Sequence, residues 1–166
     1  MTAPLWTPGT ERSVNAQISR FIRFVNEHCR ASVSADYFSL HAWAVANTED
    51  FWSAVWDFCG VVASVRGTEV LCDAHKFPGA RWFPQARLNF AENLLRFRDE
   101  RPALVSLLEN GERRELSYAD LYDQVAALAS SLRAQGVVAG DRVAAFLPNV
   151  AEAVIAMLAT SSIGAV

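Results

Sequence analysis

The last third of the chain, residues 115–166, limits most narrowly what the chain can fold into, because it carries signals for alternating helices and strands. Ser117 and Asp120 stand at the spacing of a capping box, in which the two side chains satisfy free amides at the start of a helix. Gly136 predicts the end of this helix, since glycine accepts the left-handed backbone found after many helices. Between these signals, apolar residues recur at helical spacing at Leu121, Val125, Leu128 and Leu132.

A short apolar strand is predicted next. Gly140-Asp141 favours a turn into residues 142–147, and Pro148 favours the end of that run. The apolar side chains of residues 142–147 do not alternate with polar ones, which is typical of a strand buried on both faces of a parallel sheet. We therefore predict an α/β fold that contains the first β-α-β units of a mostly parallel sheet.

A second helix follows this strand in the sequence. Asn149 and Glu152 stand at capping-box spacing, and residues 150–159 are apolar nearly all round, as in a buried helix. Gly164 predicts its end, and Ala165-Val166 starts another apolar run. Because a parallel strand needs neighbours at its edges and helices on its faces, we expect these residues to be part of a larger domain and to aggregate or pack loosely when made alone.

Helical patterns dominate the upstream residues. Residues 1–9 are predicted to form an extended arm, whose Leu5 and Trp6 we expect to dock on another surface. In the most aromatic of the predicted helices, Thr48 is the predicted cap and Gly60 the predicted end. An irregular or sheet-like stretch is expected at residues 61–73. Helices are predicted at residues 10–30, 37–43, 48–59 and 89–98.

A domain boundary is predicted at residues 98–102, where four charged residues are followed by a proline. It divides the chain into an N-terminal segment, residues 1–97, and the start of a second domain, residues 98–166. The second region opens with a predicted hairpin of residues 103–108 and 113–117, joined by a type I′ turn at Asn110-Gly111.

Composition excludes several classes of protein. The formal charge of −3, with both signs interspersed, gives no basic surface for nucleic acid, and the sequence has no apolar run of about 20 residues to cross a membrane. The N-terminus lacks a secretion signal, and the cysteines, Cys29, Cys59 and Cys72, are odd in number, which fits a reducing compartment. We expect a cytoplasmic protein without membrane or nucleic-acid partners.

Few residues suggest chemistry. Neither GxGxxG nor GxxxxGK[ST] occurs, and the pairs His28/Cys29 and Cys72/His75 lack the second half of a zinc motif. Four aromatic residues could stack on a ligand, but packing against one another is favoured. Arg81 and Arg87 could hold a phosphate, but surface ion pairs are favoured for them. The aromatic residues concerned are Trp52, Trp56, Trp82 and Phe83. We interpret Asp141-Arg142 as turn residues and Ser161-Ser162 as scaffold residues.

The order of several motifs resembles a known family. LSYADL, AGDRVAAFLPN and EAVIAMLATSSIGAV are similar to the opening of the adenylate-forming superfamily, which includes the acyl-CoA synthetases. Upstream, FWSAVWDFCGV and PGARWFPQARLNFAENLL resemble the N-terminal segment of the acetyl-CoA synthetase branch, most closely in the acetoacetyl-CoA synthetases. The resemblance covers nearly the whole chain and implies the N-terminal part of the large domain of such an enzyme.

The resemblance implies an ATP-dependent acid–CoA ligase that uses magnesium and coenzyme A and forms an acyl-adenylate. It favours acetoacetate over acetate or propionate as the acid. Because the family's phosphate loop, adenine region and catalytic lysine lie beyond Val166, it assigns no catalytic, cofactor-binding or metal-binding residue to this chain. Two alternatives stay open: a non-catalytic short form that serves as an interaction module, and an independent flavodoxin-like nucleotide binder.

Overall fold

The structure is a computed structural model that describes residues 5–166, so the first four residues of the predicted N-terminal arm lie outside the described residues. The chain divides into two compact units. Unit 1 consists of the residues up to Val61 together with Arg66–Ala86, and unit 2 consists of Val62–Val65 and Arg87–Val166.

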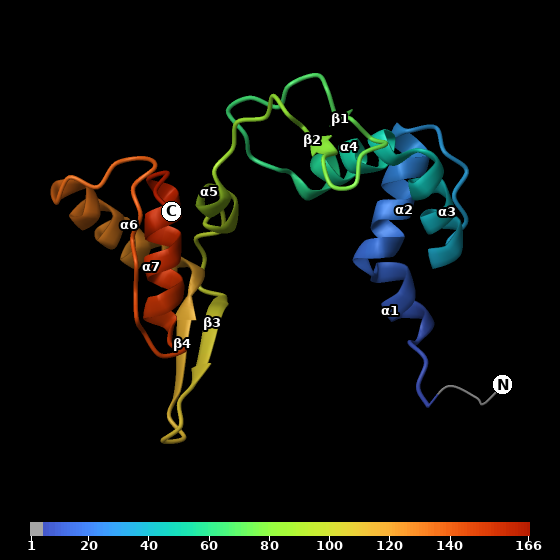
Figure 1. The fold of residues 1–166 in the computed structure, drawn as a ribbon. Helices are drawn as coiled ribbons and strands as arrows, with labels where there is room; N and C mark the ends of the chain where they lie inside the picture. The colour runs from blue at the N-terminus through green and yellow to red at the C-terminus, as the bar shows by residue number, and fades with distance from the viewer. Residues whose placement is uncertain (1–4) are drawn as a thin grey trace. The chain divides into compact units, whose positions relative to one another are not determined.

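Unit 1 is a small helical group with a two-stranded antiparallel ribbon (Figure 1). Its buried apolar side chains come from three helices and one loop, and aromatic rings surround them. The elements are α1 (Thr10–Asn15), α2 (Gln17–His28), α3 (Tyr37–Ala46), α4 (Thr48–Cys59), β1 (Leu71–Cys72) and β2 (Arg81–Trp82). The core residues are Phe21, Ile22, Val25, Val33, Leu40 and Ala54.

The helix predicted at residues 10–30 is interrupted. Ala16 has an extended backbone, with φ −63° and ψ 147°, and separates α1 from α2. The Ser19 hydroxyl donates a hydrogen bond of 2.6 Å to the carbonyl of Ser13, which offers this carbonyl a partner other than a helical amide. The apolar residues that predicted one continuous helix are therefore divided between α1 and α2.

The predicted cap of α4 is wrong, although its predicted end is confirmed. Asn47 occupies the N-cap position without a side-chain hydrogen bond to the helix, and Thr48 is already helical, its hydroxyl donating to the carbonyl of Val45. Gly60 has φ 59° and ends the helix in the left-handed conformation, where the amide of Val61 reaches the carbonyl of Trp56.

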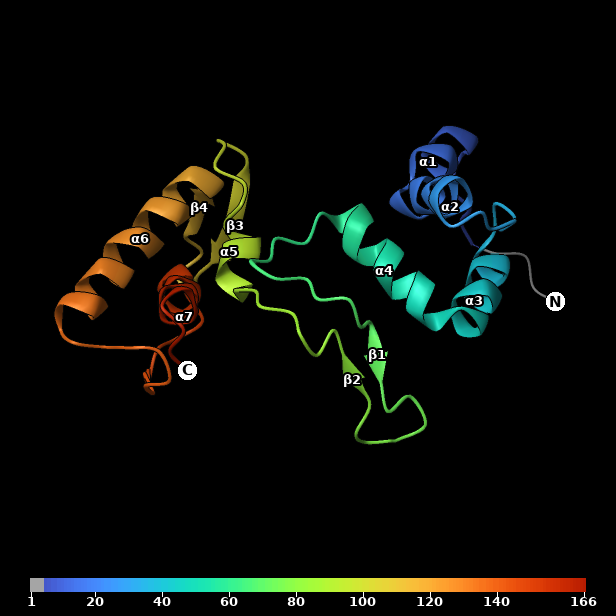
Figure 2. The same cartoon turned by 90° about the horizontal axis from the view of Figure 1, so that it is seen from above.

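Unit 2 combines an antiparallel hairpin with three helices, and Figure 2 shows α6 and α7 on the same side of the hairpin. Residues of α5, α6 and α7 pack together into one apolar core with side chains of the hairpin around it. The elements are α5 (Phe90–Leu94), β3 (Pro102–Leu107), β4 (Arg113–Ser117), α6 (Tyr118–Ala134) and α7 (Ala151–Ser162). The buried core residues are Ala91, Leu95, Leu121, Val125, Ala129, Ile155, Leu158 and Ala159.

The hairpin is confirmed, but its turn is not of type I′. Such a turn needs positive φ at two successive residues, and of the pair only Gly111 has it, at 83°. The side chain of Asn110 accepts a hydrogen bond of 2.9 Å from the amide of Glu112, which holds Asn110 in a different turn geometry. The turn is longer than predicted, because Leu108 pairs with Glu112 across it.

The capping box of α6 is confirmed. The Ser117 hydroxyl accepts a hydrogen bond of 3.1 Å from the Asp120 amide, and the Asp120 carboxylate accepts one of 3.3 Å from the Ser117 amide. The predicted end is confirmed as well, since Gly136 has φ 88° and the Val137 amide bonds the Leu132 carbonyl.

Replacing Ser117 with alanine is expected to weaken α6. Loss of the cap leaves amides of the first turn without a partner, which costs about 1 kcal/mol of helix stability. Hydrogen exchange of the first-turn amides of α6 measures this cost. Ser130→Ala is the matched control, because Ser130 is exposed within the same helix and alanine is the better helix former there. Equal exchange in the two variants would contradict a stabilising cap.

The capping box predicted at Asn149 is wrong. Helix α7 begins at Ala151, after Val150, and its N-cap position has no side-chain hydrogen bond. At the other end the prediction holds, because Gly164 has φ 78° and the Ala165 amide donates to the Thr160 carbonyl at 3.2 Å. The helix predicted at residues 89–98 is shorter than expected: Asn89 caps α5, which ends at Leu94.

The strand predicted at residues 142–147 does not form as a regular strand: this extended segment carries neither helix nor strand and joins neither antiparallel sheet. Val166 lies beside the start of this segment: its amide donates to the Asp141 carbonyl, and its carbonyl accepts from the Val143 amide, both at 2.8 Å. This alternation is the hydrogen-bond pattern of a parallel pair of strands. One pair of the predicted parallel arrangement is therefore formed, with α7 as its crossover.

Candidate functional site

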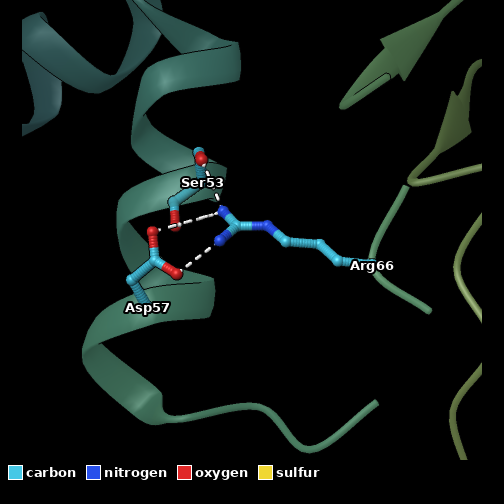
Figure 3. Close-up of polar contacts among 3 residues, drawn as sticks. All are labelled: Ser53, Asp57 and Arg66. Atoms are coloured by element: carbon cyan, nitrogen blue, oxygen red, sulfur yellow. Dashed lines mark hydrogen bonds and ion pairs between the residues drawn. The ribbon is translucent and has the colours of Figure 1, made fainter. Parts of the chain in front are cut away.

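The most connected polar group of unit 1 is centred on Arg66. Figure 3 shows its guanidinium reaching two side chains of α4, Ser53 and Asp57. One terminal nitrogen pairs with the Asp57 carboxylate, and the other donates to the Ser53 hydroxyl at 2.7 Å and to the second Asp57 oxygen at 3.2 Å. The guanidinium carbon also lies 5.6 Å from the centre of the Trp56 ring. Arg66 thus combines a forked ion pair with a cation–π contact.

Local sequence explains this geometry. Ser53 and Asp57 are four residues apart and so face the same side of α4. Gly60 ends the helix and lets the chain turn, which brings Arg66 back against the helix. Because the Arg66 and Asp57 side chains are 38% and 50% exposed, water screens the pair and its contribution to stability is modest. The arrangement fastens the segment after α4 to the helix, and both terminal nitrogens of Arg66 are already bonded within the protein.

Arg66→Ala is expected to lower the free energy of unfolding of unit 1 by about 1 kcal/mol, because it removes a forked pair and a ring contact. Arg66→Lys is expected to recover only part of this loss, since an ammonium cannot bond the carboxylate in a fork. Denaturant unfolding followed by tryptophan fluorescence measures both changes.

Arg81→Ala is the matched control for Arg66. Arg81 makes a single, longer ion pair of 3.6 Å with Asp73 and is 64% exposed, so its loss is expected to change stability by less than about 0.5 kcal/mol. An effect of Arg81→Ala as large as that of Arg66→Ala would show that the forked geometry contributes nothing of its own.

The aromatic residues weighed as a ligand-stacking site pack against one another. Trp52 meets Trp82 edge-on with ring centres 5.6 Å apart, and Trp56 lies 4.7 Å from Phe83. These pairs join α4 to the β1–β2 ribbon within unit 1. Each of these rings therefore has an aromatic packing partner, which favours the structural interpretation of these residues.

The cysteine and histidine pairs are not arranged as reactive or metal-binding groups. Burial, with the carboxylates of Asp50 and Asp57, raises the pKa of the Cys29 thiol. A hydrogen bond to Glu69 raises the pKa of the Cys72 thiol. A raised pKa reduces the thiolate fraction, which is the nucleophilic and metal-binding form. Within residues 5–166, no group of three His, Cys, Asp or Glu side chains is placed to hold a metal ion.

The other residues weighed for chemistry have structural contacts. Arg87 pairs through its backbone with Val65. Asp141 accepts a hydrogen bond of 2.8 Å from the Val138 amide, as expected of a turn residue. Ser161 and Ser162 donate to helical carbonyls of Met157 and Ala159, as expected of scaffold residues. His28 stacks on Phe24 at 4.1 Å between ring centres.

An apolar groove lies along the outer side of α7 in unit 2. It has a volume of about 320 Å³, and its neighbour Phe146 is fully exposed. Its walls are built by alternate residues of the extended segment and by one face of α7; they include Val143, Ala145, Leu147, Ala153, Ala156 and Met157. None of the described residues that line this groove is charged, which is typical of a packing surface rather than of a catalytic site.

Comparisons with known proteins match two family descriptions and several synthetases. The family description "AMP-binding enzyme" matches residues 90–166, and "Acetyl-coenzyme A synthetase N-terminus" matches residues 37–94. The acetoacetyl-coenzyme A synthetase of Rhizobium meliloti (strain 1021) is 42% identical over 98% of this chain. A solved structure, acetoacetyl-CoA synthetase from Streptomyces lividans, matches 99% of the chain with 43% identity and a TM-score of 0.89.

The chain is similar over nearly its whole length to acetoacetyl-CoA synthetases. The resemblance predicted from the sequence is confirmed, and so is the fold class: the structure matches the N-terminal part of an adenylate-forming enzyme domain. The chain spans about a quarter of the length of these acetoacetyl-CoA synthetases, 25% of the Rhizobium protein and 26% of the Streptomyces one. A malonamoyl-CoA synthetase of Penicillium aethiopicum is also similar, with 37% identity over 98% of this chain and 23% of its own length.

Three residues with long-range side-chain hydrogen bonds were missed by sequence reasoning. They are Arg66, Gln85 and Asn93, whose side chains bond partners 9 to 31 residues away. Asn93, for example, accepts from the Val62 amide and donates to the Val62 carbonyl. Periodicity reports burial, not the pairing of distant polar groups, so no signal in a single sequence marks these residues.

Among residues 5–166, no helix has both the length and the apolar character needed to span a bilayer.

Proposed function

We propose that these residues form the N-terminal part of an acid–CoA ligase that converts acetoacetate, ATP and coenzyme A to acetoacetyl-CoA, AMP and diphosphate. The observation that supports this proposal best is the 42% identity to an acetoacetyl-coenzyme A synthetase over 98% of the chain. The AMP-binding family to which residues 90–166 are matched implies the use of ATP and coenzyme A.

The proposed reaction proceeds through an acyl-adenylate. A carboxylate is a poor electrophile, and its adenylation supplies a good leaving group before the coenzyme A thiol attacks the carbonyl carbon. Charges placed around the transferring phosphoryl group stabilise such a step. We place the residues that bind the acid, the nucleotide and Mg²⁺ outside residues 1–166. The described residues do not fit a magnesium site, since they bring no three metal-ligating side chains together, and no step is assigned to the ion here.

We propose a role for each of the two predicted segments of the chain. Residues 1–97 would be the segment specific to the acetyl-CoA synthetase branch, and residues 98–166 the start of the AMP-binding domain. We further propose a cytoplasmic enzyme of lipid metabolism that acts on small molecules and has neither nucleic-acid nor membrane partners. Residues 1–166 alone are expected to be inactive.

The test is an assay of the complete gene product with coenzyme A, ATP and one acid at a time. The proposal predicts that AMP and a CoA thioester form fastest with acetoacetate and much more slowly with acetate or propionate. Malonamate is included as a fourth acid, because a malonamoyl-CoA synthetase is similar to this chain over 98% of its length. A clear preference for malonamate, acetate or propionate would overturn the acetoacetate proposal while leaving a ligase. No AMP with any acid would overturn the ligase.

A non-catalytic short form is the second candidate. Its support is that the two units carry exposed apolar side chains such as Phe38 and Phe146, which a binding partner could cover. The coding sequence distinguishes the two: an in-frame stop after Val166 favours the short form, and continuation into a phosphate loop and a distal lysine rules it out. Binding of ATP or a flavin by residues 1–166 alone would instead support an independent nucleotide binder.

A further inference from the structure

We draw no further inference here: the strongest candidate, the apolar groove between the extended segment 142–147 and α7, carries none because nothing in the structure shows what covers it.

Discussion

Leu158→Ala is expected to destabilise unit 2 by about 2–5 kcal/mol, because it leaves a cavity where α5, α6 and α7 meet. Leu158 is only 2% exposed and is among the largest fully buried side chains described. Hydrogen exchange of the α6 and α7 amides in the complete gene product measures the effect, since it reports the opening of this unit separately from the rest of the protein.

Leu158→Met is the matched control for this substitution. It nearly conserves side-chain volume, so it is expected to cost less than about 1.5 kcal/mol. If both variants exchanged like the unsubstituted protein, Leu158 would not be part of a packed core, and the arrangement of the three helices around it would be wrong.

Gly67→Ala is expected to destabilise unit 1 by about 3 kcal/mol, for two reasons of similar size. Gly67 has φ 79°, a conformation that costs an L-residue about 1–2 kcal/mol. In addition, a Cβ atom at this position would lie 2.6 Å from the Cβ of Gln85 and 2.7 Å from its side-chain oxygen. That oxygen accepts a hydrogen bond of 2.8 Å from the Thr68 amide, so relieving the clash also disturbs this bond.

Two further variants separate the backbone cost from the clash. Gly111→Ala has the same kind of backbone, φ 83°, with nothing within 4 Å of the added carbon, so it should show the backbone cost alone. In a Gln85→Gly background the clash partner is absent, and Gly67→Ala should then cost only about 1–2 kcal/mol. Denaturant unfolding measures each step of this cycle. An unchanged cost of Gly67→Ala in that background would contradict the close approach of Gln85.

Local signals in the sequence predicted element ends better than element starts. Gly60, Gly136 and Gly164 all have positive φ and follow helices as predicted, because few residues other than glycine accept this backbone. Polar caps are less specific, since a Ser, Thr or Asn side chain has several local partners. The Ser117 box was found, whereas the cap predicted at Thr48 was not, its hydroxyl being bonded to a carbonyl of the preceding turn.

Long-range pairing accounts for most of what the sequence did not predict. The strand expected at residues 142–147 is extended, and the two hydrogen bonds of Val166 pair it in the expected parallel sense. Its apolar pattern indicated burial in a sheet, but a strand becomes regular only through its neighbours. The Arg66 site was missed for a related reason, since its partners are spaced along a helix that precedes it by 9 and 13 residues.

We propose that these residues are the front part of a longer ligase, and the mass of the native gene product tests this proposal most directly. An antibody against residues 115–166 detects the natural product in an extract of the source cells, whatever its two ends are, and blotting gives its mass. Because the chain spans 25% of its Rhizobium relative, we predict a mass about four times the 18.3 kDa of these residues. A band at 18.3 kDa would instead show that the product ends with these residues and is not a longer ligase.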